Sequence, residues 1–210
     1  MIHTEIRPLF PTPVLMSALG RDITDAERKV LEDNCKPGMV KSNDGNLTSS
    51  NFYILKDNLP ELRKEFETQI DYYLKNIISP STGVSLYITQ SWLNYTEQGQ
   101  FHHEHAHPNS IISGVFYFNA HKEHDRIYFF KNQYRDMKIL PEWNWFNAES
   151  WWLPVETGML LLFPSHLRHK VAITTGDHTR ISLAFNTFAT GIIGQEDELY
   201  SLHLPPPVSY

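Results

Sequence analysis

The chain has 210 residues, of which 41% are hydrophobic, and a formal net charge of -6, which fits one soluble globular domain over residues 1–210. No stretch approaches the roughly 20 apolar residues of a membrane helix. The acidic balance disfavours nucleic acid as a partner, because such binding usually uses a basic surface. Cys35 is the single cysteine, which excludes an internal disulfide and favours a cytoplasmic location.

The first part of the chain is predicted to supply an extended lead-in and two supporting helices. Three prolines favour an extended segment over residues 6–19. Thr24 and Glu27 have the spacing of a capping box, which predicts a helix over residues 25–35. Residues 36–50 are rich in Gly, Asn and Ser and are expected to form a loop.

A second helix is predicted to begin near Pro60, because apolar residues recur there at helical spacing. This stripe consists of Leu62, Phe66, Ile70, Tyr73 and Ile77. Beyond Ser79, short β-type runs alternate with turns, which is typical of a β-core. The expected strands cover residues 84–95, 111–119, 126–131, 158–163, 169–174 and 179–187.

This order of elements predicts an α+β fold, with a double-stranded β-helix (jelly-roll) core and N-terminal helices packed on one sheet. We expect a lead-in strand and supporting helices in residues 1–80, the jelly-roll core in residues 84–190, and a C-terminal tail in residues 191–210. Residues 141–154 are predicted to be an insertion in a β-connection, either a substrate wall or a cap on the core. The insertion holds Trp143, Trp145, Trp151 and Trp152.

Histidine is concentrated in one short segment, at His102, His103, His105 and His107. On a strand, residues two apart share a face, so His105 and His107 could direct two imidazoles at one metal ion. His169 follows a very apolar predicted strand and is the best candidate for a third ligand. Three ligands on one face of a metal leave positions open for other molecules. A solvated histidine loop is the alternative, and a shift of the ligand pair to His103 and His105 also stays open.

Arg180 lies 11 residues after His169 on an apolar predicted strand, where it shares one face with Ser182. A buried arginine is costly unless it meets an anion. A planar guanidinium can hold a carboxylate through two charge-assisted hydrogen bonds. The sequence therefore predicts either a carboxylate-binding site at Arg180 or an internal ion pair with an Asp or a Glu.

Several segments, in the same order, resemble the iron(II)/2-oxoglutarate-dependent oxygenases. The likeness is greatest to a little-characterised bacterial and phage branch, extends more distantly to prolyl-hydroxylase-like oxygenases, and covers nearly the whole chain. The segments that carry it are Leu9-Phe10-Pro11-Thr12-Pro13-Val14, Ser91-Trp92-Leu93-Asn94, His105-Ala106-His107-Pro108, Ser113-Gly114-Val115-Phe116-Tyr117, Phe163-Pro164-Ser165 and Arg180-Ile181-Ser182-Leu183-Ala184-Phe185-Asn186.

The resemblance implies a dioxygenase that uses Fe(II), 2-oxoglutarate and O2 to hydroxylate a substrate, with release of succinate and CO2. It implies that the metal is held by three imidazoles, those of His105, His107 and His169. It also implies that Arg180 and Tyr117 bind the distal carboxylate of 2-oxoglutarate. Supporting contacts to this co-substrate would come from Ser182, Tyr95 and Asn94.

One residue departs from the commonest pattern of the superfamily. His107 stands where most members have an Asp or a Glu, and an all-imidazole ligand set also suits zinc, copper and nickel. The sequence does not specify the prime substrate, although a peptide side chain or a small molecule is favoured. Assembly into a homo-oligomer stays open.

Two other functions remain as alternatives. A cupin-type metal enzyme that does not use 2-oxoglutarate is one, since Gly99 and the His105-x-His107 pair fit half of a cupin motif. The glutamate of that motif is missing, because residues 110–112 are Ser, Ile and Ile. A non-catalytic β-sandwich binding module, in which the histidines are structural, is the other.

Overall fold

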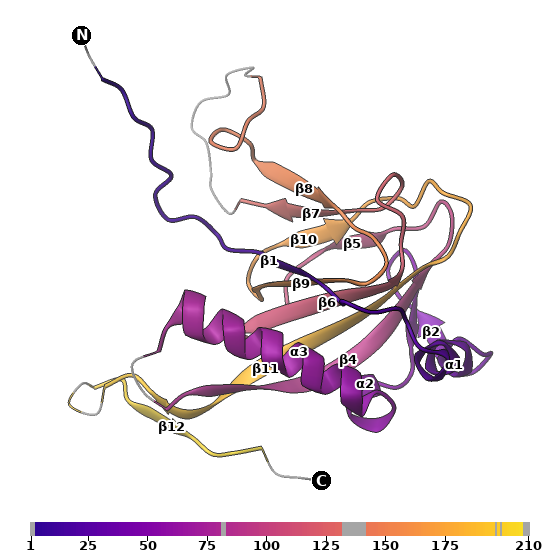
Figure 1. The fold of residues 1–210 in the computed structure, drawn as a ribbon, viewed down its shortest axis with the longest axis horizontal. Helices are drawn as coiled ribbons and strands as arrows, with labels where there is room; N and C mark the ends of the chain where they lie inside the picture. Colours follow the sequence, from indigo (N-terminus) through magenta and orange to yellow (C-terminus); the bar gives the residue numbers. More distant parts are fainter. Residues whose placement is uncertain (1–2, 81–82, 132–141, 196, 198, 208–210) are drawn as a thin grey trace.

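Two β-sheets face one another, and helices cover the outer face of the larger sheet (Figure 1). The computed structural model describes residues 3–80, 83–131, 142–195, 197 and 199–207. The large sheet has the order β1 (Leu15–Ala18), β9 (Met159–Pro164), β6 (Ile112–Asn119), β11 (Arg180–Ile193), β4 (Ser85–Thr96), β3 (Leu47–Ser49) and β2 (Val40–Ser42), and β12 (Leu202–Leu204) pairs with β11. The small sheet has the order β5 (His102–His105), β10 (His169–Val171), β7 (Arg126–Phe130) and β8 (Ser150–Pro154).

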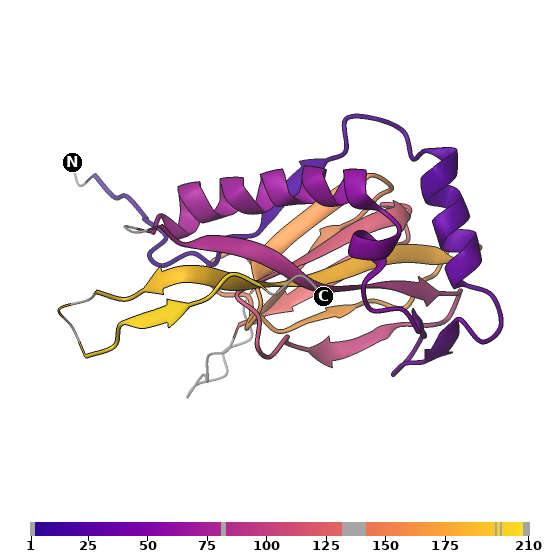
Figure 2. The ribbon, with the colours of Figure 1, turned by 90° about the horizontal axis from the view of Figure 1, so that it is seen from below.

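The two predicted helices form where the sequence places them, and a short helix that was not predicted precedes the second. Helix α1 (Asp25–Asn34) begins at a complete capping box, in which Glu27 N–H donates to Thr24 Oγ1 and Thr24 N–H donates to the Glu27 carboxylate. The short α2 (Ile54–Asp57) leads into α3 (Pro60–Tyr73), which has Pro60 in its first turn. Figure 2 shows α3 lying along the large sheet, with α1 at one end of it.

The two faces of the large sheet carry two separate hydrophobic cores. On the outer face, strand residues pack against the apolar stripe of α3, as when the Phe66 ring stacks on Phe185 at 5.4 Å between centroids. Between the sheets lies a second, smaller core. Its buried members are Tyr117, Ala120, Ile127, Phe129, Val155, Leu161 and Phe163. The space between the sheets is therefore only partly apolar, and polar side chains occupy the rest of it.

The predicted fold class, an α+β jelly-roll core with N-terminal helices packed on one sheet, is confirmed. Every expected strand is present, but the strand that begins at His169 ends already at Val171, and the strand expected over residues 179–187 continues to Ile193, into the expected tail. The apolar stripe of the second helix is buried except for Ile77, which is exposed because the chain widens into a π-turn over Leu74–Ile78.

Four short strands lie in segments for which the sequence predicted no strand. Strands β2 and β3 form a hairpin in the expected loop, β8 lies in the expected insertion and β12 in the expected tail, whereas β1 lies in the expected lead-in strand. The tryptophan-rich insertion supplies β8, which pairs with β7 along its whole length; Pro141 lies outside the described residues. These segments carry weak strand patterns of their own and become strands by pairing with the edges of longer strands.

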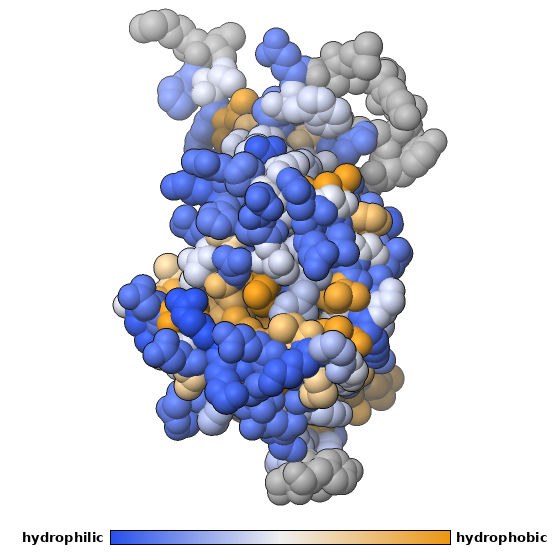
Figure 3. All heavy atoms as spheres, turned by 90° about the vertical axis from the view of Figure 1, so that its right-hand side faces the viewer, coloured by the Kyte–Doolittle hydropathy of each residue, from blue (hydrophilic) through white to orange (hydrophobic). Residues whose placement is uncertain are grey.

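In contrast to the two apolar cores, the surface of the molecule is mostly polar on the face that Figure 3 draws. Figure 3 shows the face at the right of Figure 1, where hydrophilic residues cover most of the surface and apolar residues gather in a band across its middle. No helix among the described residues combines the length and the apolar character that crossing a membrane requires.

Gly114 makes room for the central aromatic ring of the outer core. It lies opposite Phe185 in the pairing of β6 with β11, and a Cβ atom built on Gly114 would lie 2.1 Å from the Phe185 ring. Phe185 is fully buried and cannot move away without disturbing its stack on Phe66. Glycine is therefore required here by close packing of the ring, not by its backbone angles.

We predict that Gly114→Ala lowers the free energy of unfolding by about 1–3 kcal/mol, the usual cost of overpacking a filled core. Urea denaturation followed by circular dichroism measures this loss. Gly20→Ala is the control, because a Cβ atom there meets no atom within 4 Å, and it should change stability by less than about 0.5 kcal/mol. Equal stability of the two variants would contradict the packing role of Gly114.

Candidate metal centre

Three imidazoles from three segments of the chain converge between the two sheets. His105 ends β5, His107 lies in the loop that follows it, and His169 begins β10. Their ligand nitrogens all lie within 4.8 Å of one another. His105 and His107 were expected to share one strand, but β5 ends at His105. His107 is instead held by its backbone N–H, which donates to the Ser165 carbonyl at 2.9 Å.

Backbone carbonyls orient two of the three rings in the same way. Nδ1 of His105 lies 2.8 Å from the His103 carbonyl, and Nδ1 of His169 lies 2.9 Å from the Leu167 carbonyl. A carbonyl can only accept, so each Nδ1 carries the proton and each Nε2 keeps a lone pair. The Nε2 of His169 lies 3.3 Å from the Nε2 of His107. His107 Nε2 can donate to His169 Nε2 across this distance, or, when it carries no proton, can bind the same cation as the other two imidazoles.

The surroundings keep these imidazoles neutral. Burial lowers the pKa of His107 to about 3 and that of His169 to about 4, and each is lowered further by neighbouring histidines. Burial also lowers the pKa of His105, against the opposing hydrogen bond to His103. Neutral imidazole is the form that binds a metal.

A second histidine group overlaps the first. His102, His103 and His105 also bring their ligand nitrogens within 4.8 Å of one another. Both groups need His105, whose Nδ1 is already engaged with a carbonyl, so its one free nitrogen can serve only one of them. The group with His107 and His169 is more buried, whereas His103 lies near Asp44 at the surface.

A row of polar side chains crosses the inner face of the large sheet. Ser182 on β11 pairs with Asn94 on β4 and with Tyr117 on β6, and residues directly opposite in an antiparallel pair share a face. Arg180 lies two residues before Ser182 and therefore points the same way. The strand pairing thus gathers Asn94, Tyr117, Arg180 and Ser182, all of them buried, on one surface.

Arg180 is almost fully buried, at 2% exposure, and has an internal counter-ion. Its Nη1 donates to Asp125 Oδ1 at 3.3 Å and to the Ala172 carbonyl at 3.4 Å. The internal ion pair that the sequence left open is therefore present. Both contacts engage Nη1, and a guanidinium has further donors on Nε and Nη2 that can meet a second anion. Burial lowers the pKa of Arg180, while Tyr117 and Asp125 oppose that change.

Two buried polar atoms in this row have no hydrogen-bond partner among the residues that the structure describes. They are the Tyr117 hydroxyl and the Asn94 Oδ1. Burial raises the pKa of the Tyr117 hydroxyl above its ordinary value, and the nearby Arg180 charge opposes the rise. An unpaired buried polar atom costs about 1–3 kcal/mol, so two of them beside one arginine indicate a place for a polar ligand.

Tyr95 points away from this surface. It lies between Asn94 and Thr96 on β4, so its side chain faces the helices, and its hydroxyl donates to the Leu31 carbonyl of α1 at 2.8 Å. The expected contact of Tyr95 with a co-substrate does not fit this placement, because successive residues of a strand point to opposite faces.

A second row of side chains crosses the inner face of the small sheet. His169 pairs with His105 on one side and with Phe129 on the other, and Phe129 pairs with Trp151. Two aromatic rings therefore continue the line of two histidines, and Trp145 stacks on Trp151 at 4.2 Å. The sequence pointed to the tryptophans but did not identify Phe129, because only strand pairing places it beside His169.

Residues next to the proposed ligands have other partners. Glu104 forms an ion pair with Arg168 at 2.7 Å, away from the converging nitrogens, and His166 is exposed on the turn before His169. Asp125 and His178 were not identified from the sequence at all. Their signal was faint: His178 precedes Arg180 by two residues, and Asp125 directly precedes the strand that begins at Arg126.

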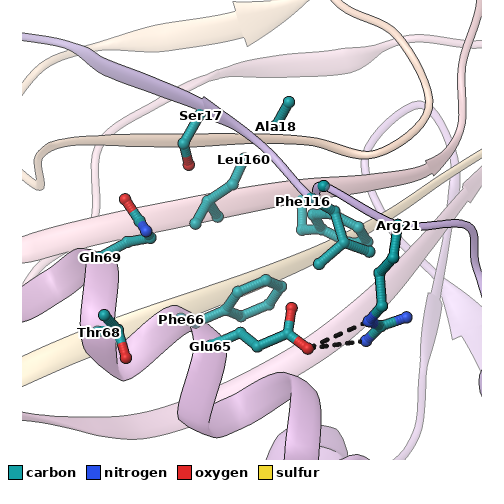
Figure 4. A pocket seen from close by; sticks show the side chains of 11 residues that line it. Ser17, Ala18, Arg21, Glu65, Phe66, Thr68, Gln69, Phe116 and Leu160 are labelled. Carbon is teal, nitrogen blue, oxygen red and sulfur yellow. Dashed lines mark hydrogen bonds and ion pairs between the residues drawn. The ribbon is translucent and has the colours of Figure 1, made fainter.

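A groove elsewhere on the molecule is separate from the histidines. It has a volume of about 450 Å³ and lies between β1 and α3, on the helix-covered face of the large sheet (Figure 4). Its lining includes Phe66, Phe116 and Leu160, and an ion pair between Arg21 and Glu65 at 3.0 Å borders it. These side chains offer an apolar floor but no cluster of metal ligands.

Solved structures share this fold at low sequence identity. The epimerase SnoN, solved with Fe3+, alpha ketoglutarate and nogalamycin RO, aligns with a TM-score of 0.62 and 12% identity, over 95% of this chain and 92% of its own. HygX from Streptomyces hygroscopicus, solved with nickel, 2-oxoglutarate and hygromycin B, aligns at 0.57 and 10%, over 84% and 82%. A Pseudomonas putida prolyl-4-hydroxylase aligns at 0.56 and 12%, over 83% and 92%.

Part of the sequence matches the model of a protein family. No curated protein matches the chain, but residues 90–186 match the profile of the family described as "Putative 2OG-Fe(II) oxygenase". That region spans β4 to β11 and contains the converging imidazoles, Arg180 and the row around Ser182. Residues 90–186, a little under half of the chain, thus resemble the 2OG-Fe(II) oxygenases, a family of oxidoreductases.

Proposed function

We propose that this protein binds Fe(II) through His105, His107 and His169 and uses 2-oxoglutarate and O2 to hydroxylate a substrate. The observation that carries the proposal is that these three neutral imidazoles, a buried arginine and two unpaired polar atoms all lie between the two sheets. When bound, iron and 2-oxoglutarate supply the oxidising chemistry, with release of succinate and CO2.

The imidazoles have two tasks in this proposal. They hold the metal on one side only, and the carbonyls behind His105 and His169 fix the ring orientation without help from the ligand. His107 takes the position in which most of the superfamily has a carboxylate, so the ligand set is neutral and the metal keeps its full charge. A neutral set strengthens the attraction of the metal for an anionic co-substrate.

The polar row suits the far end of a dicarboxylate. A carboxylate placed there would accept hydrogen bonds from the Arg180 guanidinium and from the Tyr117 hydroxyl, which has no other partner. Ser182 lies between Tyr117 and Asn94 and is available as a third donor. Asn94 contributes its amide at the edge of the same site. Tyr95 has no part in this proposal.

The Arg180 environment bears on the two rival functions. A cupin-type enzyme that does without 2-oxoglutarate has no use for a buried arginine beside unpaired hydroxyl and amide groups. A binding module with structural histidines would be expected to pair them with other protein groups instead of gathering three imidazole nitrogens within 4.8 Å of one another. Succinate formation that requires Fe(II), 2-oxoglutarate and O2 together tests the proposal against both.

The prime substrate we expect is a peptide side chain or a small molecule. A net charge of -6 disfavours nucleic acid. The rings of Phe129 and Trp151, in line with the metal histidines, would form one wall of its site. We further propose that the protein acts in the cytoplasm; whether it assembles into a homo-oligomer is left to sedimentation measurements.

His169→Ala should abolish iron retention, because two imidazoles and no carboxylate hold a divalent ion poorly. We expect less than about one tenth of the wild-type iron after anaerobic loading and desalting, measured by elemental analysis. His166→Ala is the matched control: this exposed histidine lies three residues away and should keep the full stoichiometry. Full iron content in His169→Ala would remove His169 from the ligand set.

Tyr117→Phe and Tyr95→Phe should have opposite effects. The Tyr117 hydroxyl has no partner in the described part of the chain, so its loss should not lower the free energy of unfolding but should raise the Kd for 2-oxoglutarate about tenfold. The Tyr95 hydroxyl donates to Leu31, so its loss should cost about 1 kcal/mol of stability and leave the Kd unchanged. Anaerobic calorimetric titration and urea denaturation measure both quantities; an unaltered Kd in Tyr117→Phe would contradict its assigned role.

A further inference from the structure

Asp125 is a fully buried carboxylate with a complete set of partners. Oδ1 faces Arg180 at 3.3 Å and the Thr174 hydroxyl at 3.4 Å. Oδ2 accepts from the His121 backbone N–H at 2.9 Å and lies 2.7 Å from His178 Nε2. Both oxygens are thus held from two sides, and the carboxylate has little freedom to rotate.

The backbone around Asp125 is equally constrained. Its own N–H donates to the His121 carbonyl at 2.8 Å, which closes a tight turn just before β7. Its carbonyl accepts from the Val155 N–H at 3.2 Å. The Asp125 side chain therefore extends from a turn that is fixed by backbone hydrogen bonds, whereas the side chain of Arg180 is long and flexible.

Burial explains why Arg180 needs such a partner. A guanidinium at 2% exposure has lost its water and is costly without a counter-ion. Asp125 supplies that counter-ion whether or not a ligand is bound. The contact with Asp125 engages Nη1, and the guanidinium has further donors on Nε and Nη2 that can meet a ligand.

We propose that Asp125 is a positioning residue that, buttressed by His178, holds the Arg180 guanidinium ready for the distal carboxylate of 2-oxoglutarate. The inference rests on the proposed function. A group that is already oriented loses little conformational entropy when the ligand binds, and this saving raises affinity. Asp125 does not touch the co-substrate in this scheme; it acts through Arg180.

Electrostatics gives an opposing expectation. A buried aspartate next to a carboxylate site repels the incoming anion, so a purely electrostatic effect would make 2-oxoglutarate bind more tightly when the charge is removed. Asparagine and alanine separate the two effects. Asn keeps an oxygen that can accept from Arg180 but removes the charge, whereas Ala removes both the contact and the charge.

The experiment is an anaerobic calorimetric titration of 2-oxoglutarate into each Fe(II)-loaded protein, with iron affinity measured separately. We expect Asp125→Ala to raise the Kd for 2-oxoglutarate at least tenfold with iron affinity unchanged, and Asp125→Asn to stay within about threefold of wild type. Tighter binding in both variants, or an unchanged Kd in Asp125→Ala, would overturn the positioning role.

Glu27→Ala is the matched control. Glu27 is also a buried carboxylate held by one arginine, at 2.7 Å from Arg21, and by a backbone N–H, but it lies on α1. Its loss should lower stability and leave the Kd for 2-oxoglutarate unchanged. An equal rise in Kd in Glu27→Ala would show that lost stability alone weakens binding, and would overturn the inference.

His178→Ala keeps the proposal testable if Asp125→Ala does not fold. Removing the contact to Oδ2 should loosen the carboxylate and raise the Kd about threefold, again with iron affinity unchanged. An unchanged Kd in His178→Ala would then overturn the inference. If the wild-type protein binds Fe(II) but not 2-oxoglutarate, the proposed function itself fails, which is a different result from wild-type binding that Asp125 does not affect.

Discussion

The pairing of β11 between β4 and β6 is the constraint on which the rest of the structure depends. Because side chains alternate along a strand, this one strand sends Leu183 and Phe185 toward the helices and Arg180 and Ser182 toward the small sheet. A shift of register by one residue would exchange the two sets. Such a shift would bury the Arg180 guanidinium against α3 and would turn the Phe185 ring toward the polar space between the sheets. The apolar packing of the outer core therefore selects the register that places Arg180 between the sheets.

Between the two sheets, polar groups outweigh apolar packing, which is the opposite of the outer core. Between the sheets, an ion pair at 0–2% exposure and two unpaired polar atoms replace apolar contacts. Each such feature costs free energy, whereas the packing of α3 on the large sheet gains it. The outer core therefore stabilises a fold whose inner face is arranged for a ligand. A bound dicarboxylate would remove part of that cost, so occupancy by its ligand should also stabilise the fold.

Much of the fold and of the candidate site could be predicted from the sequence, because the patterns that indicate them are either local or consist of motifs in a fixed order. The capping box at Thr24, the helical stripe after Pro60 and the long β-runs all act over a few residues. The H-x-H pair, the distal histidine and the arginine could be recognised by type and order. Sequence spacing alone could not place Tyr95, whose partner Leu31 lies 64 residues away. Nor could it place His107. Two-residue alternation along a strand would have put His107 on the same face as His105, but β5 ends at His105 and His107 lies in the loop that follows.

The contacts of Asp125 show why the remaining residues were missed. Its side-chain partners Thr174, His178 and Arg180 lie 49 to 55 residues away, and each is an ordinary residue type in an ordinary loop or strand. Only the closure of the two sheets brings them to one carboxylate. An arginine on an apolar strand could be recognised as needing an anion. The sequence around it does not tell whether that anion is a carboxylate of the protein, a ligand, or one of each. The geometry favours both at once, because the internal ion pair uses one nitrogen of a group that has three.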